Sequence, residues 1–207
     1  MKRLFLFSVL ILFVSLNLLA RKTQVYKLKL VSVELNNAEG GVINNKSNHL
    51  NLINPQYSDS LINVEWCLHP THIAMDLMND SDVNFRIIWD EVTYIGQNNI
   101  SQRMLHTGRT IIDKDDEQLP SILIKNSRIK DCFVPVDNIK WHATPISGRW
   151  AYDYLFQNET VDNIRVLFPI EIDSKRYEYI FNFNVAMDAR KLQTVVTKSS
   201  LKIFKDM

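Results

Sequence analysis

The sequence predicts an all-β protein, a sandwich or barrel of about nine or ten short antiparallel strands. The main observation is that apolar and polar residues alternate with a period of two along most of the chain after Gln24. This is the pattern of a sheet with one buried face and one wet face. Turn-forming residues separate the alternating runs at short intervals. The composition, 46% hydrophobic and 23% charged among 207 residues, is that of an ordinary globular domain.

The first twenty residues are a candidate secretory leader. Lys2 and Arg3 precede an apolar run that ends at Ala20, and this order is typical of a signal peptide. As a helix the run spans roughly 25 Å, slightly less than the bilayer core. Ala20 suits cleavage whereas Leu18 does not, so a removed signal peptide and a retained membrane anchor both stay open. We expect export to the periplasm or cell envelope, with membrane attachment only through an uncleaved 1–20 segment as an inner-membrane anchor.

Alternation is clearest in the segments 26–35, 62–68, 73–77, 85–89 and 177–185. In the first of these, the apolar positions change parity at Val31. Weaker strand signals lie at 92–95, 102–106, 121–125, 128–134 and 164–172. The residues predicted to form the core are Trp66, Met75, Leu77, Phe85, Ile87, Trp89, Phe168, Phe181 and Phe183.

The chain is divided by this pattern into a leader (1–20), an N-terminal strand with a polar loop (21–60), a β-sandwich core (61–188) and a basic tail (189–207). Residues 36–60 carry the weakest strand signal because they are polar and rich in asparagine. A structureless loop of this length is uncommon in a compact domain. The segment is interpreted as a mobile loop or as an extra hairpin around Val42 and residues 50–52.

A set of short motifs is more specific than the alternation. Two neighbouring strands end in Asn79-Asp80-Ser81 and Trp89-Asp90-Glu91. The motifs that follow in order are Arg103–Gly108, Leu119–Ile122, Gly148-x-Trp150 and Leu155-Phe156. Together, over residues 62–156, they resemble an uncharacterised family of exported β-sandwich proteins and lipoproteins of Gram-negative, Bacteroidetes-like bacteria, with no known activity.

This resemblance implies an immunoglobulin-like sandwich in the cell envelope and carries no activity to the chain. Many such proteins begin their mature chain with a lipidated cysteine. The only cysteines here are Cys67 and Cys132, so attachment through a lipid is not implied. The predicted fold class is therefore an immunoglobulin-like antiparallel β-sandwich, preceded by an N-terminal signal or anchor helix.

Cys67, His69 and His72 form a candidate metal site, because a thiol and two imidazoles within six residues suit zinc or copper. No fourth ligand lies nearby in the sequence. The plainer interpretation, a strand–turn–strand corner with two exposed histidines, is favoured.

Cys67 and Cys132 are a candidate disulfide, since the periplasm is oxidising. A bridge between the sheets needs both side chains to face inward. If Trp66 faces the core, Cys67 faces outward, so strand parity disfavours the pairing and leaves it open.

Asp113, Asp115 and Asp116 are a second candidate metal site, in a dense acidic segment whose carboxylates suit calcium. The segment has no glycine to bend it and no distant glutamate in the spacing of a calcium-binding loop. A solvated acidic turn is therefore favoured.

Four aromatic residues, Trp141, Trp150, Tyr152 and Tyr154, make residues 141–156 a candidate ligand-binding loop. Such side chains stack on sugars or hold a protein partner. The favoured interpretation is a connection that folds back over the open end of the core, with Trp150 the most buried.

Catalysis finds little support, because no nucleophile elbow, zinc-protease helix or nucleotide-binding loop is present. His106 with Asp90 or Glu91 is the one imaginable acid–base pair, and it lacks a nucleophile. The balance of 24 basic against 23 acidic residues gives no reason to expect nucleic acid as a partner. We predict a non-enzymatic envelope protein, without a cofactor, that binds a protein partner or supports an assembly. The alternative is a carbohydrate- or small-ligand-binding module that uses the loop 141–156.

Overall fold

The computed structural model describes residues 26–37, 42–45, 54–156 and 162–187. In these ranges the chain forms fourteen strands and two short 3-10 helices. In chain order they are β1 (Tyr26–Asn37), β2 (Val42–Asn45), β3 (Gln56–Ser58), β4 (Ile62–Leu68), β5 (Ile73–Asn79), β6 (Phe85–Ile87), η1 (Trp89–Glu91), β7 (Thr93–Ile95), β8 (Ser101–His106), β9 (Ser121–Leu123), β10 (Arg128–Pro135), η2 (Val136–Asn138), β11 (Ile139–Ala143), β12 (Gly148–Tyr152), β13 (Asp162–Ile172) and β14 (Lys175–Met187). The predicted leader and basic tail lie outside the described residues. No helix within these ranges is long and apolar enough to cross a membrane.

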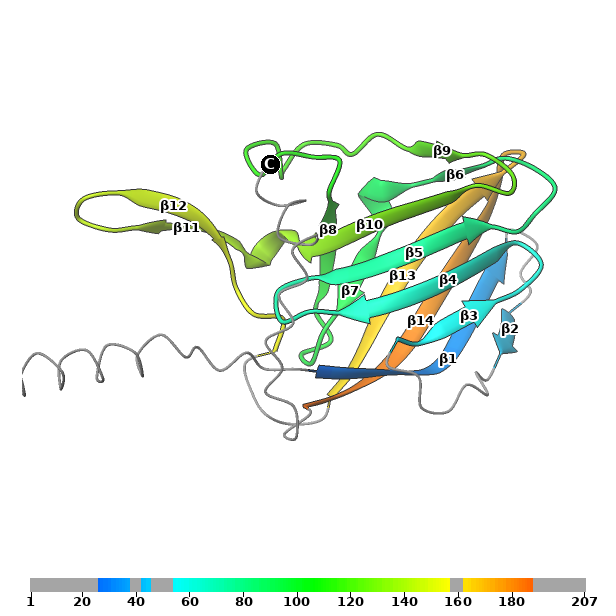
Figure 1. The fold of residues 1–207 in the computed structure, drawn as a ribbon, viewed down its shortest axis with the longest axis horizontal. Helices are drawn as coiled ribbons and strands as arrows, with labels where there is room; N and C mark the ends of the chain where they lie inside the picture. Colours follow the sequence, from blue (N-terminus) through cyan, green and yellow to red (C-terminus); the bar gives the residue numbers. More distant parts are fainter. Residues whose placement is uncertain (1–25, 38–41, 46–53, 157–161, 188–207) are drawn as a thin grey trace, which may run out of the picture.

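Twelve strands form one antiparallel sheet, which folds over on itself until it is nearly closed, like a barrel. The strand order is β2-β1-β14-β13-β7-β8-β10-β5-β4-β3, with β6 paired to β13 and β9 paired to β6. Figure 1 shows β10, β5 and β4 lying across β13 and β14. The all-β antiparallel prediction is confirmed, although the strands outnumber the predicted nine or ten. The immunoglobulin-like arrangement stays a prediction.

The core lies between the two walls of this folded sheet, and Trp66 of β4 is at its centre. The Trp66 ring is fully buried. Its centroid lies 4.9 Å from that of Phe181 on β14 and 6.3 Å from that of Phe168 on β13. All nine predicted core residues are buried. Eight of them occupy the inward parity of a strand, and Trp89 is the buried residue of η1.

The first and last described strands are hydrogen-bonded neighbours. Strand β1 pairs along its length with β14, from Tyr26 opposite Met187 to Asn37 opposite Tyr177. The register shifts between Leu30 and Ser32, and Val31 between them is exposed. A β-bulge therefore explains the parity change at Val31. The one extra residue in β1 reverses which positions, even or odd, face the core.

The segment 36–60 contains more structure than its polar sequence suggests. Strand β2, which begins at Val42, pairs with β1 rather than with a second strand inside the segment. Strand β3 pairs with the N-terminal half of β4, and its Tyr57 is buried against Phe181. The other part of the predicted hairpin, residues 50–52, lies outside the described residues.

Candidate functional site

A hairpin outside the main sheet is the candidate binding site. Among the described strands, β11 and β12 pair only with each other, from Ile139 opposite Tyr152 to Ala143 opposite Gly148. Figure 1 shows this hairpin standing away from the barrel, and every residue from 140 to 150 is exposed. We call the hairpin, residues 139–152, the arm. It contributes a surface rather than a part of the central core.

The two faces of the arm differ in chemistry. Directly opposed residues of an antiparallel pair share a face, so Trp141 and Trp150 lie together on one side. Their ring centroids are 5.6 Å apart in an edge-to-face arrangement. The alternate positions carry Lys140, His142 and Arg149 on the opposite side. The arm therefore has an aromatic face and a basic face.

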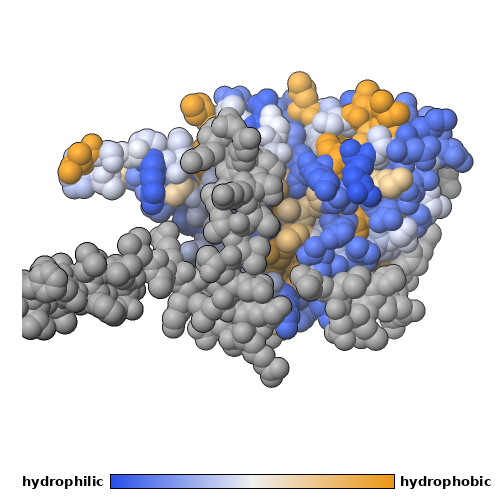
Figure 2. Space-filling model, viewed as in Figure 1, coloured by the Kyte–Doolittle hydropathy of each residue, from blue (hydrophilic) through white to orange (hydrophobic). Residues whose placement is uncertain are grey.

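The tip of the arm is a tight turn with an apolar residue at its end. The backbone N–H of Thr144 donates to the carbonyl of Ser147 at 2.6 Å, and the backbone N–H of Ser147 donates to Thr144 Oγ1 at 3.0 Å. Ile146, between them, is 97% exposed. Figure 2 shows hydrophobic atoms at the end of the projection. This side chain contributes almost nothing to packing, so it is available for contact with a partner.

The root of the arm is fixed to the barrel. A small apolar cluster holds its first residue, and the members of that cluster are Leu105, Val134, Val136 and Ile139, with Tyr152 packed against them. The backbone N–H of Asp153 donates to Asn138 O, and that of Leu155 donates to Pro70 O, both at 2.8 Å. Between the arm and the barrel lies an open hollow of about 1170 Å³. The arm is thus held in place at its base and free of the core beyond it.

Gly148→Ala is expected to displace the Trp141 ring without weakening the barrel. A Cβ at Gly148 would lie 2.1 Å from Trp141 Cζ2, well inside van der Waals contact, so the ring must rotate away. We expect the near-ultraviolet circular dichroism of the Trp141–Trp150 pair to be largely lost, with the free energy of unfolding changed by less than about 0.5 kcal/mol. Ser147→Ala, one residue away and not beneath the ring, is the control. An unchanged spectrum for Gly148→Ala contradicts this geometry.

The prediction that residues 141–156 fold back over the core is wrong for the arm. Trp150, expected to be the most buried, is 38% exposed, and Trp141 and Tyr154 are each 55% exposed. Tyr152 is half-buried at the root. Phe156 does cap the core, with its ring centroid 5.0 Å from that of Tyr26, and the partly buried Leu155 packs beside it. In residues 139–143 and 148–152, matching side chains stand in mirror-image order about a four-residue turn. The two segments pair with each other, and this symmetry is the feature of the sequence that indicates a hairpin.

The structure brings Cys67, His69 and His72 together at the turn between β4 and β5. Cys67 Sγ lies 3.6 Å from His69 Nε2, and the two half-buried imidazoles are stacked with centroids 4.3 Å apart. Burial lowers the pKa of His69, and it lowers the pKa of His72 to about 3 with His69 as a second cause. Parallel rings do not direct their nitrogens at one centre. Among the described residues, no three His, Cys, Asp or Glu side chains form a group that can hold a metal ion.

Cys67 and Cys132 are free thiols. Both lie opposite Ala74, on the strands either side of β5. With about 4.8 Å between adjacent strands, their Cα atoms are about 10 Å apart, beyond the roughly 7 Å limit for a disulfide. Burial raises the pKa of Cys132 to about 12, so this thiol stays protonated at neutral pH. As parity predicted, Trp66 faces the core and Cys67 does not.

Asp113, Asp115 and Asp116 do not converge on one point. Thr110 Oγ1 donates to Asp113 Oδ2 at 2.5 Å, and Lys114 Nζ lies 2.8 Å from Asp115 Oδ1. Asp116 is exposed to solvent. Each carboxylate has a separate environment, and within the described ranges no calcium-type cluster forms.

His106 pairs with Asp131, a residue that the sequence did not indicate, rather than with Asp90 or Glu91. Its Nδ1 lies 3.1 Å from Asp131 Oδ2, and the ring stacks on Trp89 with centroids 4.5 Å apart. The backbone N of Gly108 lies 3.2 Å from the same Nδ1, so the tautomer of the imidazole decides which of these two contacts is a hydrogen bond. Asp90 instead pairs with Arg103, and Glu91 with Arg176. The sequence prediction for the neighbours of His106 is therefore wrong.

Asp131 is the centre of a buried polar network that ties the segment after β8 to the barrel. Its Oδ1 accepts hydrogen bonds from Thr107 N at 3.0 Å, Thr107 Oγ1 at 2.5 Å and Cys132 N at 2.7 Å. The buried Gln118 completes the network, because its Oε1 accepts from His106 N at 3.1 Å and its Nε2 donates to Met104 O at 2.8 Å. Since Asp131 and Gln118 follow no local motif, only the three-dimensional fold reveals this network.

Comparison of the chain with family models, with curated proteins and with solved structures found no match. The class of protein is therefore defined by its own geometry: a nearly closed antiparallel β-barrel that carries an exposed aromatic hairpin. The resemblance to exported envelope proteins stays a prediction.

Proposed function

We propose that this is an exported, non-enzymatic protein of the cell envelope, and that it binds a protein partner, or supports an assembly, through the arm. The immunoglobulin-like arrangement of the strands and the export through residues 1–20 belong to the same proposal. Export is supported by the basic and apolar order of the first twenty residues.

The observation that carries the proposal is the exposed Trp141–Trp150 pair on a hairpin separate from the core. A two-stranded hairpin is marginally stable on its own in water, and this one exposes its most hydrophobic side chains, including Ile146 at the tip. Trp, Tyr and Arg are the residues most enriched where alanine substitution weakens protein interfaces. Burial of the aromatic face against a second protein gives the arm the packing that the barrel does not supply.

The structural role of His106 supports the proposal that the protein is not an enzyme. Its imidazole and the Thr107 hydroxyl both bind Asp131, so these groups contribute to the fold rather than form a nucleophile–base pair.

A glycan is the alternative partner for Trp141, Trp150, Tyr152 and Tyr154. The exposed Trp141 ring favours it, because aromatic faces also stack on sugars. The edge-to-face packing of the two tryptophans, at an interplanar angle of 70°, presents no flat double platform, so we rank the protein partner first.

The partner is identified by photo-crosslinking in cells of the natural source. A photoreactive amino acid in place of Ile146 is expected to give one or a few discrete protein adducts. The same amino acid in place of Asn63, exposed on β4, is the control and is expected to give none of them. Combining Trp141→Ala with Trp150→Ala is expected to reduce the adduct about tenfold or more. Adducts that carry only carbohydrate favour the alternative, and identical products from both positions contradict the proposal.

A further inference from the structure

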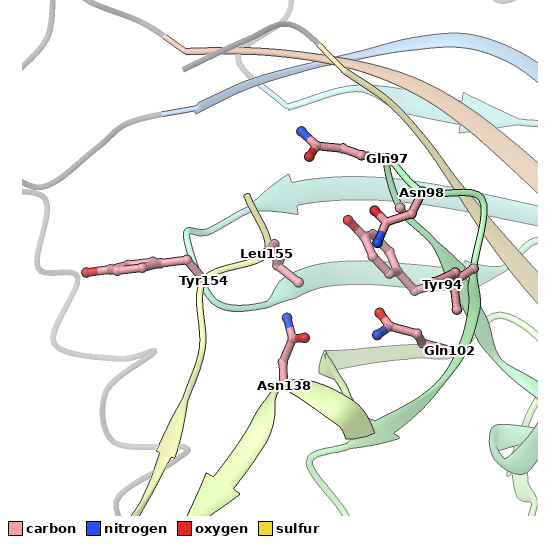
Figure 3. A pocket seen from close by; sticks show the side chains of 9 residues that line it. Tyr94, Gln97, Asn98, Gln102, Asn138, Tyr154 and Leu155 are labelled. Atoms are coloured by element: carbon pink, nitrogen blue, oxygen red, sulfur yellow. The ribbon is translucent and has the colours of Figure 1, made fainter. Parts of the chain in front are cut away.

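A small polar pocket lies between the β7–β8 turn and the root of the arm. Its volume is about 190 Å³. Its walls come from three places: the turn after β7, residue Asn138 just before β11, and Leu155 just after β12. Figure 3 shows the Tyr94 hydroxyl and the carboxamides of Gln97, Asn98 and Asn138 around this space, whereas the Tyr154 ring points away from it.

Carboxamide groups dominate the chemistry of this pocket. Four of its nine lining residues are Gln97, Asn98, Gln102 and Asn138, and none of the nine carries a charge. Each carboxamide offers two N–H donors and a carbonyl acceptor. Within the part of the chain that the structure describes, the side chains of Gln97, Asn98 and Asn138 make no hydrogen bond to protein. Gln102 is held by a 3.3 Å hydrogen bond from its Nε2 to Asp137 Oδ2.

The walls of the pocket are held in place by backbone hydrogen bonds. The N–H of Asn99 donates to Gly96 O at 3.1 Å and closes the β7–β8 turn. The hydrogen bonds of Asp153 to Asn138 and of Leu155 to Pro70 hold the opposite wall. A glycine is required at position 96, because a Cβ there would lie 2.9 Å from Tyr94 Cε1 and displace the tyrosine ring. These bonds fix the backbone that carries the carboxamides, so a ligand has to order only their side chains.

We propose that this pocket binds a neutral polyhydroxylated ligand, either a free monosaccharide or the terminal sugar of a glycan. Every sugar hydroxyl both donates and accepts, which matches a ring of carboxamides. A charged ligand does not fit, since no lining side chain compensates an ionised group on transfer from water. The volume is below the roughly 300–1,000 Å³ of sites for drug-sized ligands, so one sugar ring is the expected occupant. This site is separate from the aromatic face of the arm and does not depend on the proposed function.

The test is titration of the full-length protein with methyl glucoside, methyl galactoside and methyl N-acetylglucosaminide, followed through the side-chain amide signals in NMR. We expect saturable shifts of a few Asn and Gln amides with millimolar affinity for at least one sugar. Asn98→Ala and Asn138→Ala are each expected to weaken binding about tenfold, since each removes a hydrogen-bonding group from the ligand. Asn63→Ala, which removes an exposed carboxamide from β4, is the matched control and is expected to bind normally.

Two further probes separate the possible ligands. Glucuronate, the charged counterpart of glucose, is expected to bind at least about tenfold more weakly than the neutral sugar. An array of glycans that end in the preferred sugar distinguishes a glycan terminus, which binds more tightly than the methyl glycoside, from a free monosaccharide, which does not. Equal binding by Asn98→Ala, no saturable shift with any sugar, or equally tight binding of N-acetylglycinamide each overturns the proposal. Unfolding curves of the variants show whether the fold is intact.

Discussion

Asp131→Ala is expected to lower the free energy of unfolding by about 3–5 kcal/mol, because a buried polar network loses its central acceptor. Four groups lose their shared carboxylate: the His106 imidazole, the Thr107 hydroxyl and the backbone N–H groups of Thr107 and Cys132. Asp131 is buried and the groups around it are buried or half-buried, so water replaces these hydrogen bonds poorly. Urea denaturation followed by tryptophan fluorescence measures the loss.

The matched control for this network is Asp116→Ala. Asp116 lies on the segment after β8 that the network holds. Its side chain is 69% exposed, and its Oδ2 lies 3.8 Å from Arg109. We expect its removal to leave the unfolding midpoint unchanged, since exposed ion pairs contribute little. If Asp131→Ala is as stable as Asp116→Ala, the Asp131 carboxylate does not hold the segment after β8 and the network does not stabilise the fold.

Trp66→Ala is expected to cost about 3–5 kcal/mol, since it leaves a large cavity between the two walls of the sheet. Its ring contacts aromatic side chains from three other strands, namely Phe133, Phe168, Phe181 and Phe183. No single neighbour can fill the space from both walls. Thermal unfolding by calorimetry gives the change in melting temperature and enthalpy.

The same substitution in the arm supplies the comparison. Trp141→Ala removes an identical side chain from a position outside the core, and we expect it to leave the barrel as stable as the unsubstituted protein. Similar losses for Trp66→Ala and Trp141→Ala contradict the division into a packed barrel and a separate arm.

The strands of the core were predictable because burial on one face imposes a period of two. Trp66, Phe85 and Phe181 follow directly from this parity. Even the irregularity of β1 is visible in the sequence as the parity change at Val31, although the pattern alone does not say that an extra residue causes it.

The candidate sites were less predictable, because they depend on contacts between distant segments. His106 and Asp131 are 25 residues apart and meet only because β8 and β10 are neighbours. Asn98 and Asn138 likewise converge through the fold. The arm is the exception. Its aromatic residues are predicted from the sequence as a candidate site, and the error concerns their exposure, because residues 141–156 are predicted as a loop that folds back whereas most of them form a hairpin.

The pairing of β1 with β14 constrains the order in which the molecule can assemble. As the chain is made from its N-terminus, β1 has to wait for β14, the last described strand, before one of its two long edges is satisfied. The wall formed by β1, β14 and β13 is thus completed only after β14 has been made. Proteins dominated by such distant contacts fold slowly, so we expect this wall to form late in folding.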